Sequence, residues 1–597
     1  MIVNPTSLTI SQLLGNQSEQ YVIPSYQRRY SWHEKQLWEF LDDILLIEGS
    51  DNHLLGTIVC LVGHYAAGVN KLELVDGQQR ITTINILLHC LLERMRGEGE
   101  NAEAQSIESL LNARALGGPV VRKIALDSID AEEFEKHAAL NVIENPENSS
   151  LALAFSIFRD WVSRQPLANL GSFLYRLKNQ AVVIRLDVSN AKDAFKLFET
   201  INNRGLKLSA PDIIKNFILG NAARFGEPSL ALAKSKWSEV IKHLDGTNFE
   251  NFFRHFLAAT LKKRVTAAYV VSSFKTVFMQ QVLEAATLPD RHWYADDIEP
   301  LEEDEATEEV DNAESTPQKV VLDGATKVSF AGFLERLAKY AKIYGQIVAA
   351  KTDVPALNRH LRNLRMIKSV QTYGFLMALR AGGCSDEHYT KVLALTEAFM
   401  LRRHICRERA NDNESAFARL CGVDPFSPIP AIQEEFRRLA PSDDAFIASF
   451  SKFDFTANLI ERARYCLECF ELHKQGEYVE LVVGGADLVH VEHIIPQKIK
   501  SRRNKDEFGD WPSYLGDKSE AQHPHFVSRI GNLSLFAGSL NIGASNGPYE
   551  RKKAAYCQSA IKITNSLPDE YPEFRFAEVD TRSREFAEAA AALWPIA

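Results

Sequence analysis

The sequence predicts an α+β protein of several domains, and three observations support this prediction. The chain has 597 residues, which is more than one hydrophobic core usually organises. Over the first two hundred residues, short β-branched segments alternate with segments of helical periodicity, whereas the pattern beyond them is almost entirely helical. Strand-like and basic segments return near the C-terminal end. We therefore expect an N-terminal α+β domain over residues 1–225, a largely helical region over 226–400, and a helical lead-in with a small terminal module over 401–597.

Composition and charge narrow the class of protein. The sequence is 45% hydrophobic and 24% charged, which is ordinary for a globular protein, and its eight cysteines form no paired framework. No basic and apolar leader and no long apolar run is visible, so we expect a cytoplasmic protein with no membrane partner. The net charge of -10 argues against a protein that coats nucleic acid over its whole surface, although it permits a local basic site. The oligomeric state stays open, a homo-oligomer included.

The local patterns place several elements. Residues 53–62 and 180–188 are short, apolar and β-branched, as strands are, whereas residues 82–96 carry apolar side chains at helical spacing. Ser209 or Ala210 followed by Pro211 is a good helix start. Further helical patterns cover residues 330–348, 365–381 and 389–405, and residues 477–483 resemble a strand.

An acidic stretch near residues 296–318 separates the helical segments. It is poor in large apolar side chains, so it cannot bury enough surface to offset its chain entropy. We expect a mobile insertion there, and an acidic segment that mimics a nucleic-acid strand is the functional alternative.

The stretch "LELVDGQQRITT" (72–83) predicts a strand, a tight turn and a helix. Gln78, Gln79 and Arg80 then lie where backbone N–H groups and a helix dipole favour a phosphate. No GxxxxGK[ST] loop accompanies them. A well-capped turn on a charged rim is the plainer interpretation of the same pattern.

The stretch "DLVHVEHIIPQK" (487–498) raises the question of catalysis. It predicts a strand that ends at Pro496, with "NLSLF" (532–536) as a partner strand and a helix that starts near Pro548. In such a β-β-α unit an imidazole can deprotonate water while oxygen ligands hold a divalent cation. His493 is then the candidate base, and Glu492 and Asn541 are candidate metal ligands. On a regular strand Glu492 and His493 point to opposite faces, and a merely polar strand end is the plainer alternative.

Two basic segments could hold the phosphates of a nucleic acid. They are "KIKSRRNK" (498–505) and "ERKK" (550–553). The candidate DNA contacts in them are Lys498, Arg502, Arg503 and Lys552.

The C-terminal motifs "VEHIIPQ", "GNLSLF" and "LNIGASN", with a lysine downstream, resemble the HNH (ββα-metal) nuclease domain at the C-terminus of GmrSD-type proteins. The resemblance implies His493 as general base, Asn532 as the residue that fixes the loop and the base, and Asn541 as a ligand on the metal side. Glu492 takes the place of the usual acidic ligand, and Asn546 and Lys552 match further polar positions. The implied cofactor is Mg²⁺ or Mn²⁺.

The N-terminal motifs "IPSYQRRYSW", "DGQQRITT" and "FETINNRGLKLSAPDIIKN" are similar to the ParB-like domain that precedes the HNH module in GmrSD-type proteins. The resemblance implies binding and hydrolysis of a nucleoside triphosphate. The residues expected at the nucleotide are Gln27, Arg28, Asp76, Gln78, Gln79 and Arg80. Asn202, Arg204 and Lys215 are candidates for phosphate or DNA contacts.

Together the two resemblances imply a type IV restriction endonuclease that depends on DNA modification and on a nucleotide. We expect it to nick or cut double-stranded, modified phage DNA in anti-phage defence. One alternative is a nucleotide-switched DNA sensor with a degenerate nuclease module. The other is a nuclease activated by a partner or a signal without reading a modification.

Overall fold

The computed structural model describes residues 3–66, 69–114, 118–139, 149–202, 209–288, 327–476, 485, 487–500, 505–506, 509–544 and 547–596. The chain forms two compact units, one of residues 1–253 and 266–342 and the other of residues 254–265 and 343–597. The expected acidic insertion at 296–318 and the expected strand at 477–483 lie outside the described residues.

A mixed sheet of six strands organises the first unit, in the order β1-β8-β3-β4-β2-β7. β3 pairs parallel with β8 and antiparallel with β4, whereas β2 pairs parallel with both β4 and β7. The expected strands at 53–62 and 180–188 are confirmed as β3 and β8, which are neighbours. The strands are β1 (Val3–Thr9), β2 (Glu19–Ile23), β3 (His53–Ala66), β4 (Val69–Asp76), β7 (Ile124–Leu126) and β8 (Ala181–Val188), with a separate hairpin of β5 (Asn112–Arg114) and β6 (Val120–Arg122).

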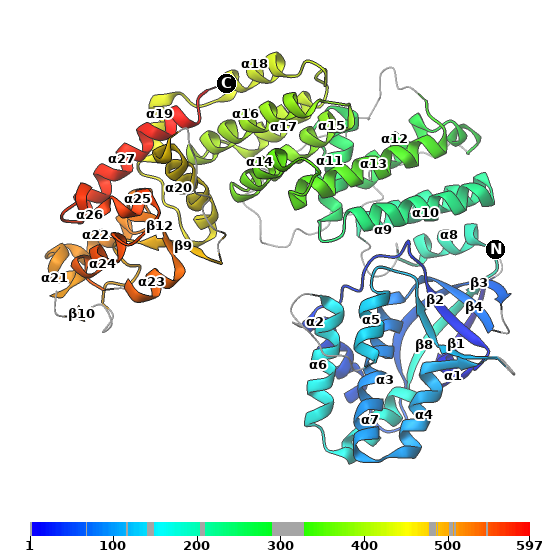
Figure 1. Ribbon diagram of the computed structural model, residues 1–597. Coiled ribbons are helices and arrows are strands. Elements are labelled where there is room, and N and C mark those ends of the chain that lie inside the picture. The colour runs from blue at the N-terminus through cyan, green and yellow to red at the C-terminus, as the bar shows by residue number, and fades with distance from the viewer. Residues whose placement is uncertain are drawn as a thin grey trace. The chain divides into compact units, whose positions relative to one another are not determined.

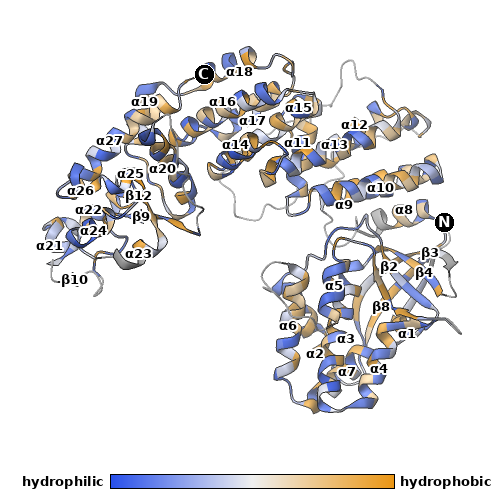
Figure 2. Ribbon diagram, in the orientation of Figure 1, coloured by the Kyte–Doolittle hydropathy of each residue, from blue (hydrophilic) through white to orange (hydrophobic). Residues whose placement is uncertain are grey.

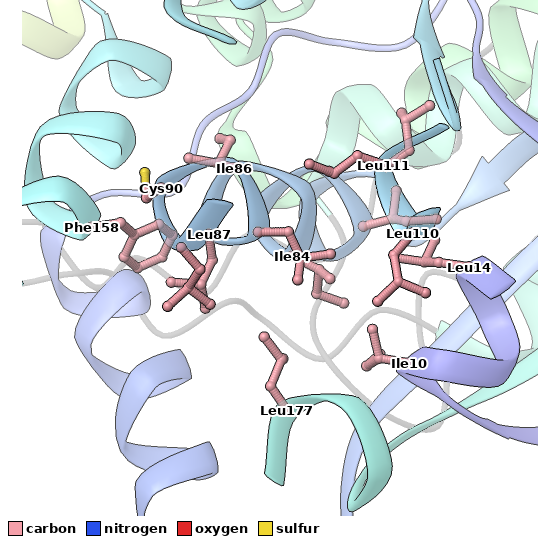
Figure 3. Close-up of a cluster of buried hydrophobic side chains, with 14 of the residues drawn as sticks. Ile10, Leu14, Ile84, Ile86, Leu87, Cys90, Leu110, Leu111, Phe158 and Leu177 are labelled. Carbon is pink, nitrogen blue, oxygen red and sulfur yellow. The ribbon is translucent and has the colours of Figure 1, made fainter. Parts of the chain in front are cut away.

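Helix α3 (Gln78–Glu98) fills the core beside this sheet, and α4 and α7 lie near it (Figure 1). Ile84, Leu87 and Leu91 of α3 are 0% exposed, and all of residues 81–92 are buried, so this part of α3 is enclosed on every side. Figure 3 shows side chains of α1, α4, α6 and α7 gathered around α3. The helices of this layer are α1 (Ile10–Gly15), α2 (Glu34–Leu45), α4 (Asn101–Leu111), α5 (Ala131–Ala138), α6 (Ser150–Arg164) and α7 (Leu167–Asn179).

A series of helices follows the sheet domain. The predicted start of α9 (Ala210–Phe225) is confirmed, because the Ser209 side chain accepts a hydrogen bond from the backbone N–H of Asp212 and Pro211 lies in the first turn. Most of these helices carry both hydrophobic and hydrophilic residues (Figure 2). They are α8 (Ala191–Asn202), α10 (Glu227–His243), α11 (Phe249–Leu261), α12 (Val270–Gln281) and α13 (Phe330–Ala349).

The second unit is also mainly helical. The expected helix over residues 365–381 is interrupted between α14 and α15, where Lys368 adopts a left-handed backbone with φ of 58°. Its helices up to the terminal module are α14 (Pro355–Met366), α15 (Tyr373–Ala381), α16 (Asp386–Ile405), α17 (Ala410–Leu420), α18 (Ile429–Leu439), α19 (Asp443–Phe450) and α20 (Ile460–Gln475). None of the described helices is both long and apolar enough to cross a membrane.

The terminal module contains the expected β-β-α arrangement. β9 (Val489–His493) pairs antiparallel with β12 (Leu533–Ala537), and α24 (Tyr549–Tyr556) starts directly after Pro548. Its core includes Ile494, Trp511 and Tyr556. The remaining elements are β10 (Lys505–Asp506), β11 (Gly509–Asp510), α21 (Trp511–Leu515), α22 (Ser519–Phe526), α23 (Gly538–Ala544), α25 (Lys562–Asn565), α26 (Leu567–Glu570) and α27 (Phe576–Leu593).

The enclosure of α3 makes a stability prediction. Leu87→Ala, at a residue that is 0% exposed, removes buried apolar volume and leaves a cavity, so it should lower the free energy of unfolding of the first unit by about 2–5 kcal/mol. Hydrogen exchange of peptides from β3 and β4 under urea measures the change. Leu46→Ala is the control, because Leu46 is 76% exposed. Equal effects of both variants would contradict the packing described here.

Candidate functional site

Two polar sites stand out, one in each unit. The C-terminal site is built on β9, where Glu492 lies opposite Ser534 and His493 lies opposite Leu533 in the antiparallel ladder. Successive side chains of a strand point to opposite faces, so the Glu492 and His493 side chains lie on different faces of β9. Glu492 is 6% exposed and His493 is half-buried, although burial does not alternate strictly along the strand, because His490 is exposed. The strand therefore separates the two neighbouring polar groups.

Glu492 is engaged in an ion pair inside the module. Lys552 Nζ lies 2.6 Å from Glu492 Oε1, and the Tyr556 hydroxyl donates a hydrogen bond of 3.1 Å to the same oxygen. Lys552 Nζ also donates to the backbone oxygens of His493, at 2.8 Å, and Ile494, at 3.1 Å. The ammonium group thus joins α24 to the end of β9.

This ion pair corrects two roles expected from the sequence. The Lys552 side chain is 1% exposed, so it does not reach the phosphates of a bound DNA. The Glu492 carboxylate already has the Lys552 ammonium and the Tyr556 hydroxyl as partners and lies on the face of β9 opposite to His493, so it is not placed as a metal ligand beside that imidazole. A buried charge that is paired and hydrogen-bonded serves the fold of the module instead.

The His493 imidazole has the protonation state that a general base needs. Burial, together with the nearby Lys552 ammonium and His523, lowers the pKa of His493 to about 4. The imidazole is therefore neutral at neutral pH. The side-chain nitrogen of Gln497 lies 3.3 Å from His493 Nε2 and can donate a hydrogen bond to it. His490, three residues earlier on β9, is exposed.

Asn532 holds the segment that follows His493. Its Oδ1 accepts a hydrogen bond of 2.8 Å from the backbone N–H of Ile495, and its Nδ2 donates to the backbone oxygens of Ile495 and Val527, each at 2.9 Å. Its backbone oxygen accepts from the N–H of Ile494. Asn532 is 0% exposed, so its contacts are those of a residue that fixes the end of β9.

The described residues do not fit a complete divalent-metal site. Asn541 is half-buried on α23, which contacts β9, but Glu492 is engaged elsewhere. Within the described ranges no group of three or more His, Cys, Asp or Glu side chains could hold a metal ion. Lys498 is exposed, whereas Arg502, Arg503 and Asn546 lie outside the described residues.

The N-terminal site forms at one edge of the sheet. β2 and β4 are parallel neighbours, so their carboxyl ends meet at the same edge, and they lead to Gln27 and Asp76. Gln27 Nε2 donates to the backbone oxygens of Leu74, at 3.1 Å, and Val75, at 3.0 Å. Its Oε1 accepts a hydrogen bond of 2.6 Å from Lys215 Nζ of α9. Ligands commonly bind at this edge in open α/β sheets.

Lys215 belongs to this edge and not to the outer surface. Its side chain is 5% exposed, and its Nζ lies 3.8 Å from Asp212 Oδ1. Burial lowers the pKa of Lys215, against the effect of the Asp212 and Asp76 carboxylates. A DNA contact, one of the two roles expected for Lys215, is therefore not possible from this position. Asn202 ends α8, and Arg204 lies outside the described residues.

Asp76 and Arg80 complete the polar edge. Burial raises the pKa of Asp76, whereas the N–H of Gly77 and the Arg80 and Lys215 cations lower it. Arg80 donates a hydrogen bond of 2.9 Å to the backbone oxygen of Thr57, and burial lowers the pKa of its guanidinium. The turn needs glycine, because Gly77 has φ of 88° and a Cβ there would lie 2.9 Å from the Ile58 side chain.

The other motif residues differ in their roles. Gln78 Oε1 is buried and without a hydrogen-bond partner among the described residues. Gln79 instead supports the preceding loop, because it accepts from the N–H of Ser31 at 2.8 Å and donates to the oxygen of Arg29 at 3.1 Å. Arg28 is half-exposed, and its Nε lies 3.8 Å from Asp212 Oδ2.

Sequence reasoning missed two residues at these sites. Asp212 directly follows the predicted helix start at Pro211, and its spacing of three residues from Lys215 could have signalled the pair. Tyr556 follows Lys552 by four residues on α24, so the two share a helix face. That spacing could have indicated that they serve one buried partner.

Comparison with protein families gives two matches. Residues 10–219 match the model described as "GmrSD restriction endonuclease, N-terminal domain", and residues 440–589 match "GmrSD restriction endonucleases, C-terminal domain". The first match contains Asp76, Arg80 and Lys215, and the second contains His493 and Lys552. Comparison with curated proteins finds no match.

The second prediction concerns the contribution of the Lys552–Glu492 ion pair to stability. Lys552→Met leaves a buried carboxylate without its cation, so the free energy of unfolding of the C-terminal module should fall by about 3–5 kcal/mol. Hydrogen exchange of the peptide spanning β12 measures this change. Lys553→Met is the matched control, because the neighbouring ammonium pairs with Glu550, which is 51% exposed, and lies over the Tyr549 ring at 5.3 Å. A loss of the same size in both variants would show that the buried pair has no special role.

Proposed function

Because the chain belongs to the GmrSD restriction endonuclease family and is thus a DNA endonuclease of restriction, we propose that it is a nucleotide-regulated enzyme that nicks or cuts modified phage DNA. In this proposal the C-terminal module is an HNH nuclease with His493 as its general base, and the N-terminal domain binds and hydrolyses a nucleoside triphosphate. The observation that carries the proposal is the position of the half-buried His493 side chain at the end of β9, where Asn532 and Lys552 hold the backbone by hydrogen bonds.

His493 removes a proton from the attacking water. A neutral imidazole can accept this proton at neutral pH, and a base must be held in place to be effective. Asn532 fixes the backbone that follows His493, and Lys552 fixes its carbonyl oxygen. Lys498 is exposed next to this segment, where a phosphate of the DNA backbone would lie.

Metal dependence is part of the proposal. The expected ion is Mg²⁺ or Mn²⁺, which would supply positive charge to stabilise the charge that develops on the phosphate. Asn541 remains the candidate ligand, and Glu492 is withdrawn from that role.

The nucleotide site is proposed for the edge of the N-terminal sheet. The Arg28, Arg80 and Lys215 cations outnumber the Asp76 and Asp212 carboxylates around it, which favours an anion such as a triphosphate. Gln27 and Gln78 supply amide groups at the same edge. Lys215 joins the proposed nucleotide ligands, whereas Gln79 acts through the loop that it supports.

Selectivity for modified DNA is assigned to the N-terminal domain. Contacts to phosphates position a duplex without reading its bases, so a nuclease module that holds the backbone is poorly selective alone. The domain that binds the nucleotide would therefore permit the nuclease module to cut only modified DNA.

The nuclease assignment is tested with His493→Ala. Loss of the base should reduce the rate of nicking of supercoiled DNA about 10²–10⁴-fold. Agarose gels measure this rate with Mg²⁺ or Mn²⁺ present. EDTA should abolish the activity of the unchanged protein. His490→Ala is the matched control, because His490 is an exposed histidine of the same strand. Cutting that persists in His493→Ala would assign the chemistry to another group.

The nucleotide assignment is tested with Arg80→Gln. The variant removes a cation beside Asp76, and a charge-assisted hydrogen bond contributes about 1.5–3 kcal/mol, so the Kd for a triphosphate should rise about tenfold or more. Isothermal titration calorimetry measures it. Arg96→Gln controls for charge, because Arg96 lies on the same helix, is 55% exposed and pairs with Glu108. Unchanged binding by Arg80→Gln would remove this edge of the sheet from the nucleotide site.

A further inference from the structure

Helix α14 in the second unit has a basic face that the proposed function does not use. Arg359, Arg362 and Arg365 are exposed on it at intervals of three residues, and Lys351 and Lys368 are exposed beyond its two ends. Residues 354–366 contain no acidic side chain, although the chain as a whole carries a net charge of -10. The charge of this helix is thus opposite to that of the protein.

The three guanidinium groups are available to a partner. In the part of the chain that the structure describes, they form no ion pair and no hydrogen bond. Two carboxylates on the helices packed against α14 already have partners: Glu397 accepts from His360 and Asn363 of α14, and Glu468 pairs with Arg464 at 2.8 Å. The Arg362 cation also acts on Glu468, whose pKa it lowers against the effect of burial. Some other exposed cations of this unit form ion pairs, as Lys391 does with Glu387 and Arg438 with Glu435.

The opposite side of α14 is fixed. Leu357, Leu361 and Leu364 are buried against the neighbouring helices. His360 Nδ1 lies 2.5 Å from Glu397 Oε1, and Asn363 Nδ2 donates to Glu397 Oε2 at 3.0 Å. The basic face is therefore presented by a rigid helix, and little conformational freedom is lost when a ligand binds to it.

One helix holds both α14 and the nuclease strand. Arg462 of α20 donates a hydrogen bond of 3.0 Å to the backbone oxygen of Ile367, at the end of α14, and Arg464 donates to the backbone oxygen of Val489, at the start of β9. These two arginines lie within a single turn of α20, and the three elements can be followed in Figure 1. The helix that carries the basic face and the strand that carries His493 are thus both hydrogen-bonded to α20.

We propose that the face formed by Arg359, Arg362 and Arg365 binds the phosphate backbone of duplex DNA and holds it for the nuclease module. This inference rests on the proposed DNA cleavage for its choice of partner. The three side chains span about 9 Å along the helix, and a duplex of that length presents about five phosphates. The contact carries no base information, so unmodified and modified DNA bind to it equally.

The test measures DNA binding without catalysis. The variant is the full chain with three substitutions combined, Arg359→Gln, Arg362→Gln and Arg365→Gln. It is titrated with a labelled, unmodified 25-base-pair duplex in EDTA at several KCl concentrations. Fluorescence anisotropy gives the Kd. Each lost phosphate contact reduces the slope of log K against log salt by about 0.9. We expect a slope smaller by about 2–3 and a Kd at least tenfold higher at low salt. Glutamine keeps a good helix propensity, and circular dichroism checks the fold.

The matched control removes the same charge elsewhere in the unit. The control variant combines Lys391→Gln, Arg419→Gln and Arg438→Gln, which remove three cations that are already paired with Glu387 or Glu435. This variant should keep the salt slope and the Kd of the unchanged protein. An unchanged slope in the α14 variant, an equal loss in the control, or no DNA binding by the unchanged protein would overturn the inference. Tighter binding of an RNA duplex of the same length would overturn the choice of DNA.

The inference and the proposed function can fail separately. If the unchanged protein cuts DNA while the α14 variant binds as tightly as before, only the inference is lost. If binding depends on α14 but no DNA is cut with any metal, the proposed nuclease activity is lost and the inference stands.

Discussion

The alternation of side chains along β9 decides the chemistry of the C-terminal module. Because neighbouring strand residues face opposite sides, Glu492 enters the core while His493 stays at the partly exposed face. The buried carboxylate requires a cation, and Lys552 supplies it while also binding the carbonyl oxygens of His493 and Ile494. The same ammonium then contributes, after burial, to the low pKa of His493. One ion pair thus supports both the position and the protonation state of the proposed base.

A comparable constraint shapes the N-terminal site. Two parallel strands bring Gln27 and Asp76 to one edge, and the left-handed Gly77 allows α3 to start directly after β4. Lys215 of α9 also lies at this edge, although it is far from Gln27 in the sequence. The burial of these groups weakens their hydration and strengthens their interactions with any anion that enters. Such an arrangement suits the proposed binding of a triphosphate.

The sequence predicted the elements of both sites better than the partners of their side chains. The pairing of β9 with β12 and the start of α24 follow from a period of two and from a proline, which are local signals. Lys552 and Lys553 are adjacent in the same basic stretch, yet one is buried and the other is not, because only the packing of α24 on β9 distinguishes them. The burial of Lys215 could not be predicted for the same reason, since its partner Gln27 is 188 residues away. The pattern of α14 indicated a helix, but the lack of acidic partners around it is a tertiary property.

In the proposed function, one chain couples nucleotide binding to the cutting of modified DNA. The most direct measurement is the cleavage rate of the unchanged protein on phage DNA with glucosylated bases and on the same DNA without the modification, each with and without a triphosphate. We expect cutting of the modified DNA, little cutting of the unmodified DNA, and a clear change in the cleavage rate of the modified DNA when the nucleotide is added. The proposed function would be contradicted if the cleavage rates on both substrates and on DNA with phosphorothioate linkages were equal and no nucleotide changed them.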